Sequence, residues 1–199
     1  ALLAAAGVSP SLLSDSVMPG TQVGTLTESI SLETGVGKLP VIAVAGHDTA
    51  SAIAAVPADN PHFAYLSSGT WSLLGVMSDE PILTEEARLA GFTNEGGTDG
   101  KICFLQNITG LWILQKLMQE WKEEGKDVAY STLLPATEMA ETDALIDVDD
   151  TVFQCPVSMA EAITNYCIAH QQTSPSTHGE FVKCVLRSLA LRYKTGIEA

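Results

Sequence analysis

The sequence has few cationic residues and no long apolar run. Lys and Arg number 10 against 24 Asp and Glu, which gives a formal net charge of −14 at pH 7. Such a surface repels phosphate backbones, so we expect no nucleic-acid partner. No stretch approaches the roughly 18 uninterrupted apolar residues of a membrane span, and no basic segment precedes the apolar residues 1–6 as in a signal peptide. We therefore expect a soluble, cytoplasmic protein with no membrane partner, in which residues 1–6 end a helix of a longer polypeptide.

The cysteines are few, and their spacing matches no metal motif. They are Cys103, Cys155, Cys167 and Cys184, without any C-x-x-C pair. A structural zinc site is therefore not expected, and reduced thiols are expected of a cytosolic protein. Cys167 and Cys184 fall on two consecutive predicted helices, and whether a disulfide bridges them stays open.

The order of apolar segments predicts an α/β fold. With 46% apolar and 17% charged residues, the 199-residue chain can build a core of one large domain, or one and a half. We expect a loop-rich segment over 1–39, a buried strand over 40–46 and a helix over 49–56. A hairpin from strands 63–67 and 71–77 follows, then mainly loop over 78–100 and a strand over 101–106.

The remainder of the chain has the pattern of helices. Asn107 is a favourable N-cap for a helix with an apolar stripe, and capping boxes open two more helices at Ser158 and Thr177. The last amphipathic pattern reaches residues 197–199 without a stop signal. We therefore expect the chain to be a fragment of a larger protein.

Asp48 is the first candidate for chemistry. It follows the apolar stretch 41–45 within the run Gly46-His47-Asp48-Thr49. A carboxylate at the end of a buried strand is costly unless it has a partner or a catalytic task, such as accepting a proton from an attacking hydroxyl. The structural alternative is that Asp48 caps a helix beginning near residue 50, and both interpretations stay open.

A turn after the next apolar stretch offers groups that suit phosphate oxygens. In Ser68-Gly69-Thr70, backbone N–H groups and hydroxyls lie between two strands. A plain hairpin turn is the alternative, and the turn is not a Walker A loop because no Gly-Lys-Ser/Thr follows. Together with Asp48, this turn suggests phosphoryl transfer to a hydroxyl.

Four polar residues are secondary candidates, each with a structural alternative. His47 adjoins Asp48 and is either a hydrogen-bonded bystander or a substrate contact. Gln115 interrupts an apolar helical stripe, which indicates either the edge of that stripe or a ligand contact. Asn107 is expected to cap a helix whatever else it does, and Glu95 is a second acid if the Asn94-Glu95-Gly96-Gly97 segment folds inward.

The ordered motifs resemble the FGGY family of carbohydrate kinases. They are Pro19-Gly20-Thr21, Gly46 to Ala52, Leu66 to Leu73, Asn94 to Gly97 and Gln106 to Gln115. The last two are most similar to the rhamnulokinase branch of the family. The resemblance covers nearly the whole chain, is densest from about residue 17 to 118, and thins after 125.

This resemblance implies a fold and an activity. The fold is the α/β actin-like ATPase fold, which is ribonuclease H-like, with residues 1–39 ending the N-terminal lobe and the inter-lobe linker, and residues 40–199 forming the first part of the C-terminal lobe. The activity is phosphorylation of L-rhamnulose at its 1-hydroxyl, in L-rhamnose catabolism, with ATP and Mg²⁺.

The resemblance also implies roles for particular residues. Asp48 would be the general base. The residues implied to bind ligands are His47, Asp48, Thr49 and Asn107 for the sugar, and Gly69, Thr70 and Gln115 for the nucleotide. No residue of this chain is implied as a metal ligand.

The chain departs from the family in length. Members are more than twice as long, and neither the Asp-x-Gly-Thr phosphate loop nor the Gly-Gly-Gly segment is present here. We therefore expect this chain alone to be inactive and to associate with the missing lobes or with itself. Two alternatives remain, namely a kinase for ribulose, xylulose or fuculose, and a non-catalytic binding module.

Overall fold

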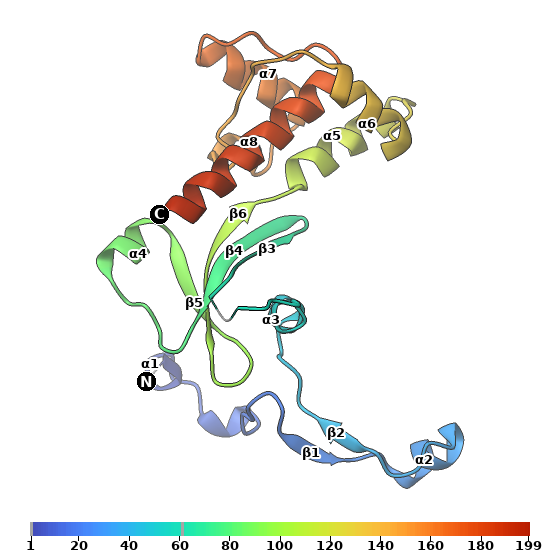
Figure 1. Ribbon diagram of the computed structural model, residues 1–199, viewed down its shortest axis with the longest axis vertical. Coiled ribbons are helices and arrows are strands. Elements are labelled where there is room, and N and C mark those ends of the chain that lie inside the picture. The colour runs from blue at the N-terminus through green and yellow to red at the C-terminus, as the bar shows by residue number, and fades with distance from the viewer. Residues whose placement is uncertain (1, 61) are drawn as a thin grey trace.

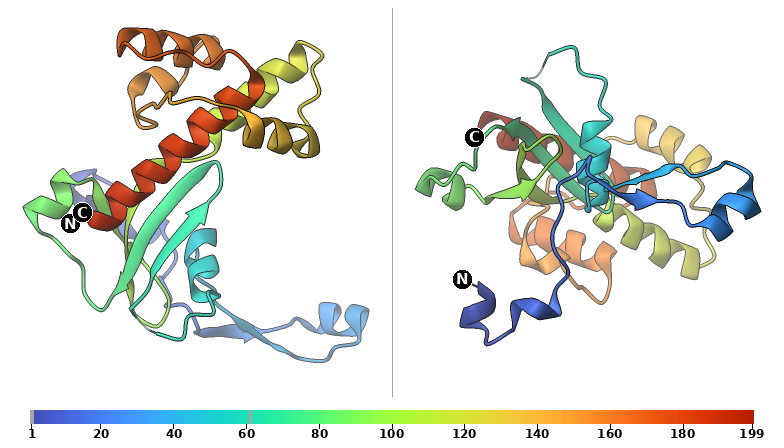
Figure 2. Two further views of the ribbon diagram at one scale, coloured as in Figure 1. Left: turned by 45° about the horizontal axis from the view of Figure 1, so that its top comes forward. Right: turned by 90° about the horizontal axis from the view of Figure 1, so that it is seen from below.

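The computed structural model describes residues 2–60 and 62–199, which form three regions along the long axis of the molecule (Figure 1). An N-terminal arm lies at one end, a four-stranded sheet in the middle and a cluster of helices at the other end. Helix α8 (His178–Glu198) runs from the helical cluster to the sheet, while the arm projects away from both (Figure 2). The mixed α/β class expected from the sequence is confirmed.

The arm consists of short elements with almost no buried side chains. They are α1 (Leu2–Ala5), the 3-10 helix η1 (Pro10–Leu12), β1 (Gln22–Thr25), α2 (Glu28–Thr34) and β2 (Pro40–Ile42). Strands β1 and β2 form an antiparallel pair that is exposed throughout. The buried strand predicted over 40–46 is therefore wrong, since β2 ends at Ile42 and Val44 is 74% exposed. An apolar run becomes a buried strand only where a second surface covers it.

The central sheet is antiparallel throughout. Its strands are β3 (Ala64–Ser68), β4 (Trp71–Ser78), β5 (Phe92–Gly96) and β6 (Ile102–Thr109), in the order β3-β4-β6-β5. Strands β3 and β4 confirm the predicted hairpin. The prediction of mainly loop over 78–100 is only partly right, because the segment also contains helix α4 (Glu85–Leu89) and edge strand β5. Pairing with β6 stabilises β5, and its Phe92 ring stacks on Phe104 at 4.4 Å.

The pleat of the strands gives this sheet two different faces. Leu73 and Asn107 lie opposite each other in β4 and β6 and share one face, against which helix α3 (Asp48–Ala54) packs. The other face carries Ser72, whose hydroxyl is 2.7 Å from the hydroxyl of Tyr193 in α8. Helices α3 and α8 therefore cover opposite faces.

The largest core lies in the helical cluster. Its elements besides α8 are α5 (Trp112–Glu123), α6 (Tyr130–Met139), the 3-10 helix η2 (Thr151–Phe153) and α7 (Met159–Ala169). Leu117, Ile163 and Val185 are fully buried between them. Among the described residues, no helix combines the length and the apolar character needed to cross a membrane.

The two predicted capping boxes differ in outcome. Thr177 and Glu180 form the reciprocal box at the start of α8, as predicted. At the start of α7, the Ser158 hydroxyl accepts from the Glu161 N–H, but a different carboxylate completes the cap. Glu120 of α5 accepts hydrogen bonds from the Ser158 hydroxyl at 3.0 Å and from the main-chain N–H groups of Met159 and Ala160. Glu120 thereby joins α5 to α7.

We expect Glu120→Gln to lower the free energy of unfolding by about 1–3 kcal/mol, because hydrogen bonds to a charged acceptor at a helix N-terminus are lost or weakened. Equilibrium urea unfolding measures the change. Glu124→Gln, at the exposed end of the same helix, is the matched control and should change stability by less than about 0.5 kcal/mol. Equal effects of the two variants would contradict this role of Glu120.

We expect the stability contribution of Glu180 to depend on pH. Hydrogen bonds from the main-chain N–H of Ser176, then from its hydroxyl and from the Thr177 N–H, hold the pKa of the Glu180 carboxyl below its ordinary value of 4.5. A depressed pKa adds stability above the unfolded-state pKa, and this is lost as pH falls through the folded-state pKa. The stability difference between wild type and Glu180→Gln should therefore be full at pH 7 and shrink below about pH 4.5. Unfolding curves across this pH range measure the stability difference, with Glu138→Gln as control. A difference that does not change with pH would contradict this contribution of Glu180.

All four cysteines are free thiols in the structure. Cys155 is exposed, and the other three are buried. Burial raises the pKa of Cys167 and raises that of Cys184 to about 12, with the nearby Cys167 as the second cause. Both of these core thiols are therefore neutral at pH 7.

Candidate active site

Helix α3 begins at the predicted base. Asp48 is its first residue, and His47 is the N-cap residue, without a side-chain capping bond. Asp48 Oδ1 accepts a hydrogen bond from the Thr49 N–H at 2.7 Å, while the Asp48 side chain stays 95% exposed. The alternative that Asp48 is the N-cap is therefore wrong by one position, although its carboxylate still satisfies one free N–H of the first turn. Thr49 is buried, whereas the Asp48 carboxylate remains open to a ligand.

Strand β5 brings a second acid to the start of α3. Glu95 Oε2 lies 3.4 Å from His47 Nδ1, and Asp48 Oδ1 lies 3.4 Å from His47 Nε2. The imidazole therefore lies between two carboxylates, one from a helix and one from the sheet. The hypothesis that Glu95 folds inward agrees with this contact, but a strand rather than a loop carries Glu95.

The β3–β4 turn contacts the start of helix α5. The Thr70 hydroxyl donates a hydrogen bond to Gln115 Oε1 at 3.2 Å. Main-chain bonds join the same segments, since the Leu111 N–H donates to Gly69 O at 2.8 Å and the Trp112 N–H to Thr70 O at 3.2 Å. The three residues predicted to bind nucleotide, Gly69, Thr70 and Gln115, therefore lie together.

Gly110 allows this contact between turn and helix. A Cβ at this position would lie 2.6 Å from Gly69 O, 2.7 Å from the Trp71 carbonyl carbon and 2.8 Å from the Ser72 N. No side chain fits against these rigid backbone atoms. The close approach requires glycine at position 110.

Asn107 lies on strand β6, so its prediction as a helix N-cap is wrong. Helix α5 begins only at Trp112, with Leu111 as the cap residue and no side-chain capping bond. Strand β6 continues past Asn107 because β4 offers it pairing partners as far as Thr109. The exposed Asn107 side chain shares its face of the sheet with Glu95, which is paired with Cys103.

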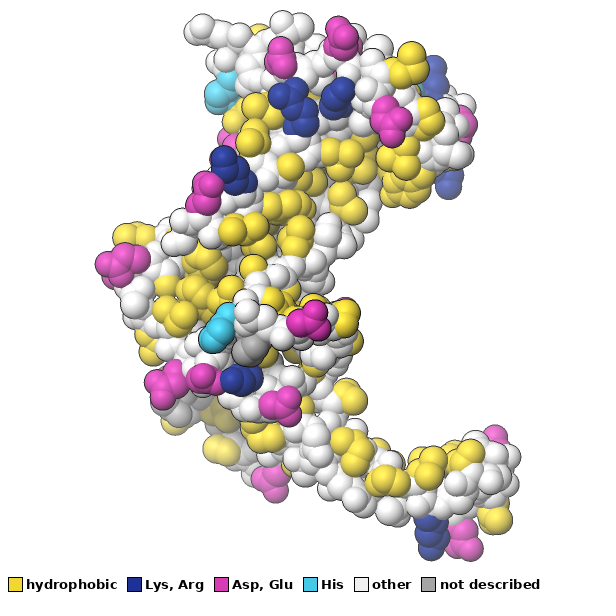
Figure 3. All heavy atoms as spheres, in the orientation of Figure 1, with side chains coloured by type: hydrophobic (Ala, Val, Ile, Leu, Met, Phe, Trp, Pro, Cys, Tyr) yellow, Lys and Arg dark blue, Asp and Glu magenta, His cyan; other side chains and the backbone are white. Residues whose placement is uncertain are grey.

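The predicted residues form two groups with separate contacts. Within the described residues, no hydrogen bond or ion pair joins Asp48 to Thr70. Along β6, Asn107 lies between Cys103, which is opposite Glu95, and Thr109, which is opposite Trp71. Helix α3 and the tip of the β3–β4 hairpin both lie on the side where the molecule is hollowed (Figures 1 and 3).

An apolar layer lies between α3 and the sheet. Ile53, Leu73 and Leu105 pack there around Tyr65, which is 5% exposed. Burial raises the pKa of the Tyr65 hydroxyl well above its usual value, and Cys103 and then Glu95 add to the shift. Tyr65 therefore stays neutral at pH 7.

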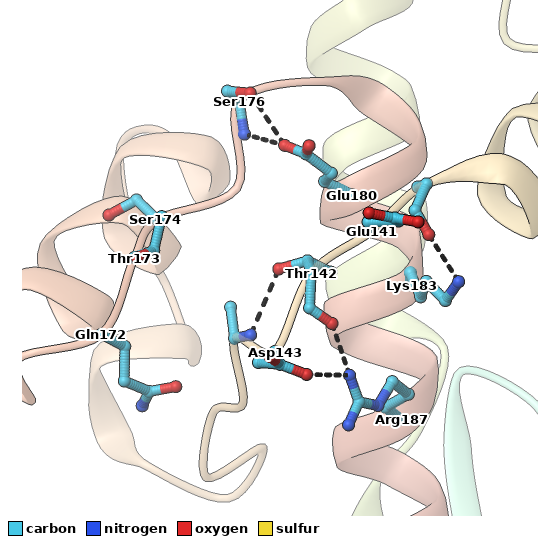
Figure 4. A pocket seen from close by; sticks show the side chains of 12 residues that line it. Glu141, Thr142, Asp143, Gln172, Thr173, Ser174, Ser176, Glu180, Lys183 and Arg187 are labelled. Carbon is cyan, nitrogen blue, oxygen red and sulfur yellow. Dashed lines mark hydrogen bonds and ion pairs between the residues drawn. The ribbon is translucent and has the colours of Figure 1, made fainter.

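A separate cavity contains none of the predicted site residues. It measures about 780 Å³ and lies between α8, residues 140–144 and residues 172–176 (Figure 4). Its cations Lys183 and Arg187 donate hydrogen bonds to the main-chain carbonyls of Ala140 and Thr142. These contacts hold the 140–144 segment against α8.

A family model agrees with the motifs. Residues 64–199, more than half of the chain, match the C-terminal domain of the FGGY family of carbohydrate kinases. The chain belongs to this family. The FGGY resemblance of the sequence motifs is thereby confirmed.

Relatives of this FGGY chain agree with the match. The rhamnulokinase of Bacteroides thetaiotaomicron is 46% identical over 198 residues, which cover 99% of this chain and 40% of that protein. The rhamnulokinase of Pectobacterium atrosepticum is 43% identical over 190 residues, which cover 94% of this chain and 36% of that protein. The chain thus spans about two fifths of the length of these relatives.

A solved structure supports the fold. The crystal structure of xylulose kinase from Rhodospirillum rubrum superposes with a TM-score of 0.63 at 17% identity, over 99% of this chain and 39% of that one. At this identity the likeness shows the fold alone. It confirms the predicted actin-like ATPase fold of FGGY kinases.

Two residues at this FGGY site were missed or weakly indicated by the sequence. Gly110 stood inside a matched motif, but only the backbone approach shows why glycine is needed there. Glu95 was assigned to a loop, and its contact with His47 joins residues that are 48 positions apart. No local pattern could have predicted that contact.

Proposed function

We propose that this chain is part of a sugar kinase that transfers the γ-phosphoryl group of ATP to the 1-hydroxyl of L-rhamnulose, in L-rhamnose catabolism. The observation that carries the proposal is the exposed Asp48 carboxylate, fixed at a helix start within a chain that resembles rhamnulokinases along nearly its whole length. Those relatives are named for rhamnulose phosphorylation, which is why this ketose is preferred over others.

Asp48 is the general base in this proposal. Its carboxylate accepts the proton of the ketose 1-hydroxyl while that oxygen forms a bond to the γ-phosphorus of ATP. The bond between the γ-phosphorus and the bridging oxygen breaks, and ADP leaves with the electron pair. His47, Thr49 and Asn107 contact the sugar, with Asn107 reaching it from strand β6.

The nucleotide is bound at the β3–β4 turn. The Thr70 hydroxyl and the Gly69 main chain contact phosphate oxygens, and the Gln115 amide contacts the nucleotide. The hydrogen bond from Thr70 to Gln115 supports this assignment, because it keeps both polar groups at one edge of the sheet before the nucleotide arrives.

The described part of the chain offers no side-chain cluster suited to a resident metal ion. Among residues 2–60 and 62–199, no group of three or more His, Cys, Asp or Glu side chains is arranged to hold an ion. In the proposal, Mg²⁺ arrives as part of ATP·Mg²⁺, and no step is assigned to a metal held by this chain.

The domain assignment is part of the same proposal. Residues 1–39 end the N-terminal lobe and form the linker, and residues 40–199 form the first part of the C-terminal lobe. The family match beginning at residue 64 supports the second assignment. We also propose a cytoplasmic location, and the remaining lobes of the kinase or a second copy of the chain as partners.

A panel of ketoses tests the proposed substrate. A full-length kinase carrying this chain is assayed for ADP release with L-rhamnulose, ribulose, xylulose and fuculose. We expect kcat/KM to be highest for L-rhamnulose by about tenfold or more, a difference of about 1.4 kcal/mol in transition-state binding. A higher value for another ketose would overturn the substrate assignment, and no turnover with any ketose would overturn the kinase function.

A further inference from the structure

Glu95 contacts the proposed sugar site without belonging to it. Its carboxylate lies 3.4 Å from His47 Nδ1, and its side chain is 36% exposed against 53% for His47. The other ring nitrogen of His47 faces Asp48 Oδ1 at 3.4 Å. The His47 imidazole therefore lies between the Glu95 and Asp48 carboxylates and contacts both of them.

Strand β5 holds Glu95 in a fixed position. The adjacent Asn94 side chain makes two hydrogen bonds of 2.9 Å with the main chain of Ile82, one accepted and one donated. On the other side, the Gly97 N–H donates to Lys101 O at 2.9 Å, and Glu95 itself is paired with Cys103 in β6. A carboxylate on so constrained a strand can fix the orientation of a more exposed side chain.

We propose that Glu95 is a positioning residue of the kinase, which holds the His47 ring and thereby sets the hydrogen bonding of Asp48. This inference rests on the proposed function, because it assigns a role beside the base of that reaction. In this role Glu95 acts on the reaction through His47 and not through a contact of its own with the sugar or the nucleotide.

The chemistry follows from the two nitrogens of a histidine ring. A neutral imidazole carries one N–H, and the partner of one nitrogen decides what the other can do. When Glu95 accepts the Nδ1 hydrogen of a neutral ring, Nε2 carries no hydrogen, so it donates nothing to the Asp48 Oδ1 that it faces. The Asp48 carboxylate then stays available to accept the proton of the substrate hydroxyl.

Loss of Glu95 would change this arrangement. The imidazole would be free to carry its hydrogen on Nε2 and donate it to Asp48 Oδ1. A carboxylate that already accepts a hydrogen bond from a neighbour is a weaker base, because hydrogen bonding stabilises its charged form. Turnover should fall, although Asp48 and His47 are both still present.

The surroundings of Glu95 favour this role over a simple surface charge. It is the only charged residue of β5, and it lies at the edge of the apolar layer that includes Tyr65 and Cys103. A carboxylate next to apolar side chains is costly without a partner. Among the described residues, His47 is the basic side chain that lies within 4 Å of the Glu95 carboxylate.

A double-mutant cycle tests the proposal in the full-length kinase. The variants are Glu95→Gln, His47→Asn and their combination, with Glu86→Gln on the exposed helix α4 as matched control. The readouts are kcat, KM for the ketose and KM for ATP. We expect Glu95→Gln to lower kcat roughly ten- to a hundredfold, by analogy with partners that orient metal-binding histidines, and to leave KM for ATP unchanged.

The cycle separates positioning from folding. When His47 is already replaced by Asn, adding Glu95→Gln should lower kcat by less than about a further twofold, because the imidazole ring through which Glu95 acts is already absent. Full additivity of the two changes, or an equal loss in Glu86→Gln, would overturn the proposal. A wild-type enzyme that phosphorylates no ketose would instead overturn the proposed function, so the two failures are distinguishable.

Discussion

Asp48→Asn should lower kcat of a full-length kinase carrying this chain by at least about a hundredfold, because an amide cannot accept the proton of the sugar hydroxyl. Asn has nearly the same side-chain shape as Asp. The amide oxygen of Asn can still accept the Thr49 N–H, so the start of α3 should be retained. Steady-state ADP release with saturating ketose measures kcat, and circular dichroism confirms that the variant is folded.

Asp15→Asn, on the exposed N-terminal arm, is the control for the loss of one negative charge and should keep wild-type turnover. Near-full activity of Asp48→Asn would contradict the base assignment. Asp48 would then have only a structural role at the first turn of α3.

Gly110→Ala should separate the β3–β4 turn from helix α5. The added Cβ would lie within 2.6–2.8 Å of three main-chain atoms, which cannot rotate away as a side chain would. Overpacking of this kind costs about 1–3 kcal/mol of stability. If the displaced turn weakens nucleotide binding by about 1.4 kcal/mol, KM for ATP rises about tenfold. Urea unfolding measures the loss of stability, and steady-state kinetics measure KM for ATP and KM for the ketose.

Gly96→Ala is the matched control for Gly110→Ala. Gly96 lies in strand β5, and a Cβ there meets nothing within 4 Å. Its substitution should leave KM for ATP unchanged. An unaltered KM for ATP in Gly110→Ala would show that the contact between turn and helix has no part in nucleotide binding.

Short-range patterns predicted those parts of the fold that short-range interactions stabilise. The hairpin of β3 and β4 has a tight turn between two apolar runs, and the Thr177–Glu180 box lies within one helical turn. Both depend on neighbours in sequence, and both are confirmed.

The predictions that failed concern segments whose structure depends on residues far away in the sequence. Strand β5 depends on its pairing with β6 and on the stacking of Phe92 on Phe104, so residues 78–100 resembled a loop. Asn107 has the side chain of an N-cap, but pairing with β4 keeps it in a strand. In the apolar run over 40–46, residues 40–42 and Val44 are exposed because no second surface covers them among the described residues, and of its apolar side chains only Ala45 is buried.

The site residues could be named from motifs, but their arrangement could not. The sequence indicated Asp48, Thr70 and Gln115 separately, whereas the bond between Thr70 and Gln115 joins residues 45 positions apart. The contact of Glu95 with His47 and the close approach at Gly110 likewise depend on how the sheet is assembled.

The most direct test is a crystal structure of a full-length kinase carrying this chain, with the ketose and a non-hydrolysable ATP analogue bound. We expect the Asp48 carboxylate to lie within about 2.6–3.2 Å of the 1-hydroxyl oxygen, and Thr70 to contact a phosphate oxygen. A sugar bound with all its hydroxyls beyond hydrogen-bond reach of Asp48 would contradict the role of Asp48 as general base.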